Sequence, residues 1–146
     1  MRLLVQRSKE ASVTIDGKVT GKINSGLVVL VGFTHTDTEE EIDYLVEKLI
    51  HLRIFDDENG VMNRSLCDVG GEILSVSQFT LYADTKKGHR PSYVAALNGK
   101  EATKLYDIFN QKLKDKGVKV ETGIFGSDMK VALTNDGPIT ILLEKE

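Results

Sequence analysis

Three polar side chains, Ser77, Gln78 and Thr80, interrupt a hydrophobic segment in the middle of the chain. Apolar residues at 73, 74 and 76 predict a buried strand that continues to Leu81. Buried polar groups cost free energy unless they find hydrogen-bond partners. We therefore expect these three to hold the backbone in an unusual position or to meet a ligand. An edge strand whose hydroxyls are satisfied within the protein is the alternative.

A side-chain nucleophile at this segment has little support. A nucleophilic serine or threonine requires an adjacent base. Neither a G-x-S-x-G motif nor an evident His–Asp pair accompanies Ser77, which disfavours a hydrolase built on Ser77 and His89. The end of the strand can instead offer the backbone N–H groups of Phe79 and Thr80 to a developing oxyanion. The hydroxyl of Thr80 would then orient a substrate or a water molecule.

A second motif, Asn135-Asp136-Gly137-Pro138, separates two apolar stretches near the end of the chain. Asp-Gly in this setting is typical of a hairpin turn, which predicts strands at 130–134 and 139–143 joined by the motif. Pro138 fits poorly just inside a paired strand because it lacks an N–H. Gly137 has no Cβ and would let the backbone approach a ligand closely. A functional turn is therefore the alternative to a plain one.

Positive charge is concentrated shortly after the Ser77 segment, at Lys86, Lys87 and Arg90. Such runs are usually solvated loops, but beside a candidate site this one could bind phosphate groups. The whole chain has a net charge of −3, which provides no general attraction for nucleic acid. Any contact with RNA or DNA must therefore use a local basic patch.

The side chains that commonly bind metals are scattered along the chain. The three histidines are His35, His51 and His89, and no pair has the spacing of zinc ligands. The single cysteine, Cys67, excludes an internal disulfide and is better explained as a small buried hydrophobe than as a catalytic thiol. We therefore expect neither a metal nor a cofactor.

The length of 146 residues, 40% of them hydrophobic, predicts a single domain over residues 1–146 with a substantial core. The chain starts directly in strand-like sequence, so we expect no signal peptide. Its longest apolar run is too short to cross a membrane. We therefore expect a cytoplasmic protein with no membrane partner.

Hydrophobic periodicity predicts strands, a helix, strands, a second helix and strands. The continuous apolar run at 27–33 indicates a central strand covered on both faces. The first helix begins at Thr38, which fits a capping box with Glu41. Pro91 opens a second helical region, interrupted at Asn98-Gly99, that ends at Gly117. The fold class is therefore a single mixed α/β domain whose sheet layers are covered by two main helices.

The two motifs together resemble the signature motifs of the D-aminoacyl-tRNA deacylases. Similar residues elsewhere extend the resemblance over essentially the whole chain, and the departures, such as Tyr93 where Phe is usual, lie outside the key positions. The segments that carry the resemblance are Ser77-Gln78-Phe79-Thr80-Leu81, Asn135-Asp136-Gly137-Pro138-Ile139-Thr140, Gln6-Arg7, Gly26-Leu27, Leu52-Arg53-Ile54-Phe55, Met62-Asn63, Arg90-Pro91-Ser92 and Gly123-Ile124-Phe125-Gly126.

The resemblance implies a homodimeric enzyme of the D-aminoacyl-tRNA deacylase fold that hydrolyses the ester of D-aminoacyl-tRNA. It implies that a cis Gly137-Pro138 unit enters the active site of the opposite subunit and excludes L-substrates by steric clash. Achiral glycine would escape this exclusion, so glycyl-tRNA, including glycine mischarged on tRNA(Ala), would also be a substrate. The 2′-OH of the terminal adenosine would assist the attacking water.

The resemblance also assigns roles to individual residues. Arg7 would hold the Gly137-Pro138 unit in place, while Phe79 and Thr80 would donate to the oxyanion. Ser77 and Gln78 would take part in catalysis, and Gln78 and Met129 would line the adenosine pocket. The phosphates of the acceptor stem would be bound by Lys86, Lys87 and Arg90. Two alternatives stay open: a non-catalytic RNA- or nucleotide-binding module, and a hydrolase with Ser77, Thr80 or Cys67 as nucleophile.

Overall fold

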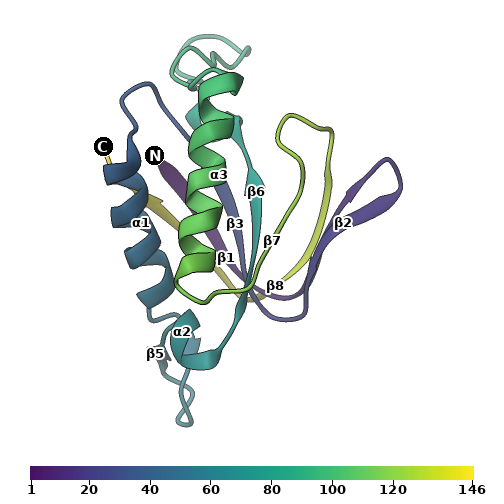
Figure 1. The fold of residues 1–146 in the computed structure, drawn as a ribbon, viewed down its shortest axis with the longest axis vertical. Coiled ribbons are helices and arrows are strands. Elements are labelled where there is room, and N and C mark those ends of the chain that lie inside the picture. Colours follow the sequence, from purple (N-terminus) through teal and green to yellow (C-terminus); the bar gives the residue numbers. More distant parts are fainter.

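The computed structural model describes residues 1–146, and a six-stranded mixed sheet forms its centre (Figure 1). The strand order is β2-β1-β3-β6-β7, and β8 also pairs with β1. The elements in chain order are β1 (Arg2–Ile15), β2 (Lys18–Ile23), β3 (Gly26–Gly32), α1 (Glu39–His51), β4 (Phe55–Asp56), β5 (Met62–Arg64), α2 (Leu66–Val69), β6 (Glu72–Ser77), the 3-10 helix η1 (Phe79–Tyr82), α3 (Gly99–Asp115), β7 (Val120–Thr122) and β8 (Lys130–Glu144).

β1 is long enough to belong to two parts of the sheet. Residues Arg2 to Ser8 pair antiparallel with β3, whereas Ala11 to Ile15 pair antiparallel with β2. β8 runs antiparallel to β1 over nearly its whole length. Because β1 continues past β3, its second half and β2 fold over the far face of β3 and β6.

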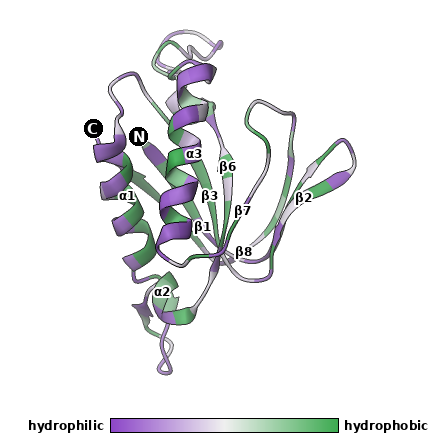
Figure 2. Cartoon of the chain, in the orientation of Figure 1, coloured by the Kyte–Doolittle hydropathy of each residue, from purple (hydrophilic) through white to green (hydrophobic).

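β3 and β6 contribute to two hydrophobic cores, since successive side chains of a strand point to opposite faces. On one face Leu27, Val29 and Ile73 are fully buried beneath α1 and α3. On the other face Val28 and Leu74 are fully buried against β1 and β2. Figure 2 shows β3 as a hydrophobic strand behind the two helices. The prediction of a central strand covered on both faces is confirmed.

α1 begins as its sequence predicts. The Thr38 hydroxyl accepts a hydrogen bond from the backbone N of Glu40 at 3.3 Å, and the Glu41 carboxylate accepts one from the backbone N of Thr38 at 2.7 Å. The Thr38 hydroxyl also donates to the Glu41 carboxylate at 2.7 Å, and these hydrogen bonds from the side chain and the backbone of Thr38 lower the pKa of Glu41. The capping box is therefore confirmed, as is the mixed α/β fold class.

The second helix begins later than predicted. Residues 91–97 form no helix, and α3 starts at Gly99 after Asn98, whose side-chain oxygen accepts from the backbone N of Glu101 at 3.0 Å. The helical region predicted to open at Pro91 is therefore wrong. Reciprocal backbone hydrogen bonds between Asp84 and Ser92, both 2.8 Å, hold this segment extended.

The hairpin predicted at 135–138 does not form. β8 is one strand, and both of its halves pair with β1 in the same direction. Asn135 pairs with Ser8 and Thr140 with Gln6, so residues 136–139 bulge opposite the single residue Arg7. A hairpin would have joined two strands that pair with each other. Here the residues on both sides of the bulge instead pair with the same strand, β1.

Two short elements were also not anticipated. β6 ends at Ser77, so the strand predicted to reach Leu81 is wrong beyond that point, and η1 follows instead. The single helical turn α2 forms after Ser65, whose side chain accepts from the backbone N of Asp68 at 3.2 Å. None of the helices combines the length and the apolar character needed to cross a membrane.

Candidate active site

The end of β6 turns sharply away from the sheet at Gln78. The backbone N of Gln78 still donates to Val31 O at 2.8 Å, which continues the pairing with β3. Its φ of −147° and ψ of 82° then lead the chain into η1. Leu81 N donates to Gln78 O at 3.2 Å, and Arg2 Nη1 donates to Leu81 O at 2.7 Å. The turn is therefore fixed both by its own backbone and from β1.

This turn leaves two backbone donors unused. The first N–H groups of any helix have no partner within it. At Phe79 and Thr80, the first two residues of η1, neither N–H donates a hydrogen bond to another protein group. Two adjacent free N–H groups at a strand end are what an oxyanion requires. Their role as oxyanion donors stays a prediction.

The polar side chains of this segment have different surroundings. Gln78 Nε2 donates a short hydrogen bond to Thr80 Oγ1, so these two side chains bridge the turn. Ser77 is half-buried and forms no side-chain hydrogen bond, whereas the neighbouring Ser75 is fully buried and bonded to Tyr106. The hydroxyl that the protein satisfies internally is thus Ser75, and Ser77 stays available.

Ser77, Gln78, Phe79 and Met129 line one pocket of about 250 Å³. Sequence analysis assigned all four to the site, and the structure brings Met129 to the end of β6 from a loop about 50 residues further along the chain. The rest of the lining is Val76, Phe125, Gly126, Ser127, Asp128 and Val131. The segment around Phe125 therefore belongs to the site, although only the family resemblance, and no local pattern, pointed to it.

The pocket contains no side chain placed as a general base. Its one carboxylate, Asp128, is 89% exposed and forms an ion pair with Lys130 at 3.0 Å. Histidine is absent from the lining. No cluster of three or more histidine, cysteine, aspartate or glutamate side chains is placed to hold a metal ion. Apart from Asp128, the polar side chains of the lining are the hydroxyls of Ser77 and Ser127 and the amide of Gln78.

Cys67 lies outside this site. It is exposed on α2, at the end of the molecule opposite the loop that precedes α3 (Figure 1). The expectation that it is a buried hydrophobe is therefore wrong. Desolvation raises the pKa of its thiol above the ordinary value, and the carboxylate of Asp68 acts in the same direction. A thiol that stays protonated is a poor nucleophile.

The bulge of β8 is held from beneath by Arg7. This side chain is nearly buried, at 8% exposure, and its Nε donates to Asp136 O at 3.0 Å. Its Nη1 donates to Ile54 O at 2.8 Å and lies 3.4 Å from an oxygen of Asp56. The guanidinium thus ties the residue before Gly137 to the β4–β5 hairpin. Sequence analysis assigned Ile54 no role beyond carrying the resemblance and did not point to Asp56, since a contact between distant segments leaves no local signal.

The bulge is also closed by the side chain of Asn135. Its Oδ1 accepts from Ile139 N at 2.8 Å, and its Nδ2 donates to Thr140 Oγ1 at 2.9 Å. Gly137 and Pro138 project between these anchors and are exposed, and the bond between them is cis. Gly137 has a φ of +135°, and a Cβ there would lie 2.8 Å from Ile139 Cγ1. Glycine is therefore required at this position.

Within one chain, the bulge and the pocket lie at opposite ends of the sheet. Arg7, beneath the bulge, pairs with Leu27, which pairs with Ile73. The pocket begins at Val76, about 10 Å further along β6 at the usual rise per residue. In Figure 1 the loop after η1 lies at the top and β5 at the bottom. Gly137 therefore does not reach the pocket of its own chain.

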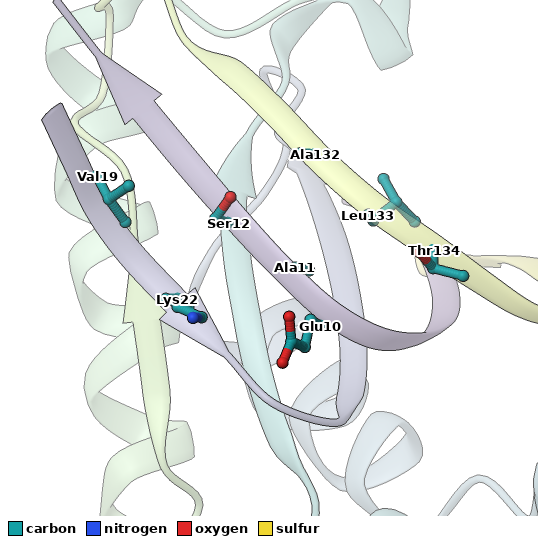
Figure 3. A pocket seen from close by; sticks show the side chains of 8 residues that line it. All are labelled: Glu10, Ala11, Ser12, Val19, Lys22, Ala132, Leu133 and Thr134. Atoms are coloured by element: carbon teal, nitrogen blue, oxygen red, sulfur yellow. The ribbon is translucent and has the colours of Figure 1, made fainter. Parts of the chain in front are cut away.

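A larger hollow of about 390 Å³ lies on the face of β1, β2 and β8 (Figure 3). Small side chains such as Ala11, Ser12 and Ala132 form it, and Glu10 and Lys22 are its only charged residues. It contains none of the residues assigned to the site, and no histidine or cysteine lines it. The smaller pocket beside η1 is therefore the candidate active site.

The basic residues Lys86, Lys87 and Arg90 are all exposed in the loop that leaves η1. The Asp84–Ser92 backbone pair closes this loop, and it therefore starts and ends near the pocket. The structure thus places the predicted phosphate-binding residues on the pocket's side of the molecule, far from the bulge. Their contact with phosphate stays a prediction.

The chain is similar to known proteins over its full length. Residues 4–144 match the family model described as D-Tyr-tRNA(Tyr) deacylase. The chain is 57% identical to a D-aminoacyl-tRNA deacylase of Thermus aquaticus, over 99% of this chain and 95% of the relative. It is 58% identical to a D-aminoacyl-tRNA deacylase of Bacillus velezensis, over 100% of this chain and 99% of the relative.

Solved structures agree with this similarity. One titled c-Myc DNA Unwinding Element Binding Protein matches with a TM-score of 0.94 and 39% identity, over 100% of this chain and 99% of that one. A probable eukaryotic D-amino acid tRNA deacylase matches with a TM-score of 0.85 and 20% identity, over 97% of each chain, which shows a shared fold.

Proposed function

The chain belongs to the D-Tyr-tRNA(Tyr) deacylase family of hydrolases that proofread translation by acting on D-aminoacyl-tRNA, and we propose that the protein contributes only backbone groups to the chemical step. The observation that carries this proposal is the pair of free N–H groups of Phe79 and Thr80 beside a pocket without a side-chain base. Gel or thin-layer assay of D-tyrosyl-tRNA hydrolysis tests the activity itself. A cytoplasmic location is part of the proposal, because that is where its substrate is made.

The reaction is hydrolysis of an activated ester. The oxygen of a water molecule bonds to the carbonyl carbon, and the carbonyl oxygen becomes an oxyanion that accepts from Phe79 N–H and Thr80 N–H. Removal of one such donor typically costs 100- to 1,000-fold in rate. The 2′-OH of the terminal adenosine hydrogen-bonds the attacking water. The oxyanion then re-forms the carbonyl as the bond to the 3′ oxygen breaks, the 3′ oxygen takes the proton that the attacking water gives up, and the D-amino acid and tRNA leave.

A second copy of the chain completes each site. The exposed Gly137-Pro138 unit cannot reach the pocket of its own chain, which supports a homodimer in which each subunit lends this unit to its neighbour. Its carbonyl groups would face the substrate α-carbon and hold the amino group. The side chain of an L-substrate would then meet rigid backbone, whereas that of a D-substrate would point away.

Glycyl-tRNA, including glycine carried on tRNA(Ala), is expected to be hydrolysed at a rate within about 100-fold of the D-tyrosyl ester. Glycine has no side chain that could clash with the Gly137-Pro138 backbone, so exclusion by clash does not apply to it. Parallel assays with glycyl-, D-tyrosyl- and L-tyrosyl-tRNA measure this, with the L-ester as the control that must stay intact. Turnover of the D-ester with no detectable turnover of the glycyl ester would contradict exclusion by clash.

Replacing Lys86, Lys87 and Arg90 with alanine is expected to weaken tRNA binding and its dependence on salt. Each lost phosphate contact should reduce the slope of log K against log salt by about 0.7–0.9. Affinities measured by anisotropy between low and physiological salt provide the slope. Lys114→Ala is the matched control, because Lys114 is exposed at the opposite end of α3. An unchanged slope in the triple variant would place the phosphates elsewhere.

A further inference from the structure

Two exposed aromatic side chains lie against each other at the edge of the pocket. Phe79 is 53% exposed and Tyr93 is 42% exposed, although both are large and largely apolar. Their rings pack edge to face with centroids 5.1 Å apart. Phe79 lines the pocket, and Tyr93 extends the aromatic surface away from it. Exposed aromatic rings that are gathered in this way usually mark a binding surface.

The fold holds this pair beside the basic loop. The reciprocal Asp84–Ser92 hydrogen bonds close the loop that carries Lys86 to Arg90, and Tyr93 follows directly after Ser92. Ala96 N donates to Tyr93 O at 3.0 Å, which turns the chain back beyond it. The pair therefore lies between the pocket on one side and the positive charges on the other.

We propose that Phe79 and Tyr93 form a stacking platform for the unpaired base that precedes the terminal adenosine of tRNA. This rests on the proposed function, in which the terminal adenosine occupies the pocket and the phosphates of the acceptor stem meet the basic loop. The strand that joins these two points must pass over the aromatic pair. Single-stranded nucleic acids are commonly held in this way, by bases stacked on aromatic rings beside a positively charged track.

Substrates of increasing length test this proposal with Tyr93→Ala. The D-aminoacyl ester of adenosine alone should be hydrolysed with the wild-type kcat/KM, since no base precedes the adenosine. For the ester of a CCA trinucleotide and for D-aminoacyl-tRNA, kcat/KM should fall about 5- to 100-fold, the usual effect of losing one stacked base. Tyr93→Phe should restore it. Val94→Ala is the matched control, because Val94 is 82% exposed on the same loop but has no aromatic ring.

A substrate that is abasic at the penultimate position completes a double-mutant cycle. It should lower kcat/KM of the wild-type protein by the same factor as Tyr93→Ala, and the variant should lose nothing further. Equilibrium binding of non-hydrolysable 3′-amide analogues of each length gives the same comparison without turnover. Additive losses in this cycle would overturn the platform.

Two other outcomes would also overturn the proposal. An equal loss on the adenosine ester would show that Tyr93 acts on the pocket itself. Dissociation of Tyr93→Ala into monomers in sedimentation, with wild-type protein dimeric, would show that the aromatic pair is an interface between copies. Failure of the wild-type protein to hydrolyse D-aminoacyl-tRNA would instead contradict the proposed function. That outcome differs from failure of the stacking platform, because it is seen with the wild-type protein alone.

Discussion

Replacing Arg7 with alanine is expected to lower the rate of D-aminoacyl-tRNA hydrolysis by about 100-fold, the usual effect of misplacing a positioning group by an ångström. The guanidinium joins Asp136 O to Ile54 O, and its loss releases the backbone that leads into Gly137. The same change leaves buried acceptors unpaired, at a cost of about 1–3 kcal/mol in the free energy of unfolding. Single-turnover assays below the melting temperature of the variant measure the rate.

Arg7→Lys is the matched control for charge. Lysine keeps the positive charge, but it lacks the planar group that donates in two directions at once. Compared with Arg7→Ala, Arg7→Lys should therefore restore more of the lost stability than of the lost hydrolysis rate. A lysine variant as fast as wild type would show that the bulge needs the charge and not the two fixed hydrogen bonds.

Subunit mixing shows whether the Arg7 effect reaches the neighbouring subunit. The second parent is Phe79→Pro, which removes one free N–H at a position where proline fits the first turn of a helix. In a heterodimer of the two variants, one site would have an intact pocket and an intact Gly137-Pro138 unit. Activity should therefore return to about a quarter of wild type in a random mixture of dimers. A mixture as inactive as both parents would mean that each chain supplies its own unit.

A substrate whose terminal adenosine lacks the 2′-OH is expected to react about 100- to 10,000-fold more slowly, the usual contribution of a positioned acid or base. The pocket offers no side chain for this task, since its one carboxylate is solvent-exposed and ion-paired. Turnover of 2′-deoxy and normal D-aminoacyl-adenosine esters measures the effect. Binding of the two esters, measured separately, should differ much less than their rates.

Three alanine variants provide the control for this prediction. Ser77→Ala, Thr80→Ala and Cys67→Ala should each keep turnover within about tenfold of wild type, whereas loss of a true nucleophile is far more costly. Thr80 has the largest expected effect of the three because Gln78 is bonded to its hydroxyl. Complete loss in any one variant, with the fold intact, would establish that residue as the nucleophile and contradict substrate assistance.

Local patterns in the sequence were sufficient where the structure is determined locally. The capping box of Thr38 and Glu41 forms as its sequence predicts, and the first helix starts directly after it. The strand at 27–33 was recognisable because burial on both faces leaves no polar residue in it. These features depend on neighbours within a few residues along the chain.

The errors arose where a distant partner decides the structure. Asp136-Gly137 has the composition of a hairpin turn, yet pairing of both flanks with β1 overrides that signal. The apolar residues Phe79 and Leu81 looked like strand, but β6 ends when its neighbour β3 ends at Gly32. Met129 was assigned to the same site as Ser77 only through the resemblance, because the two residues meet through tertiary structure alone.

The bulge at 136–139 sits in the interior of a strand that is anchored at both ends, and this constrains how the protein can change. A loop tip tolerates insertions, because the added residue simply projects into solvent. Here one residue gained or lost would either break the contact with Arg7 or shift everything after it along β1. Such a shift turns Ile139, Ile141 and Leu143 to the opposite face of the sheet. The length of this segment is therefore fixed by the core, so new substrate preferences must come from the residues surrounding it.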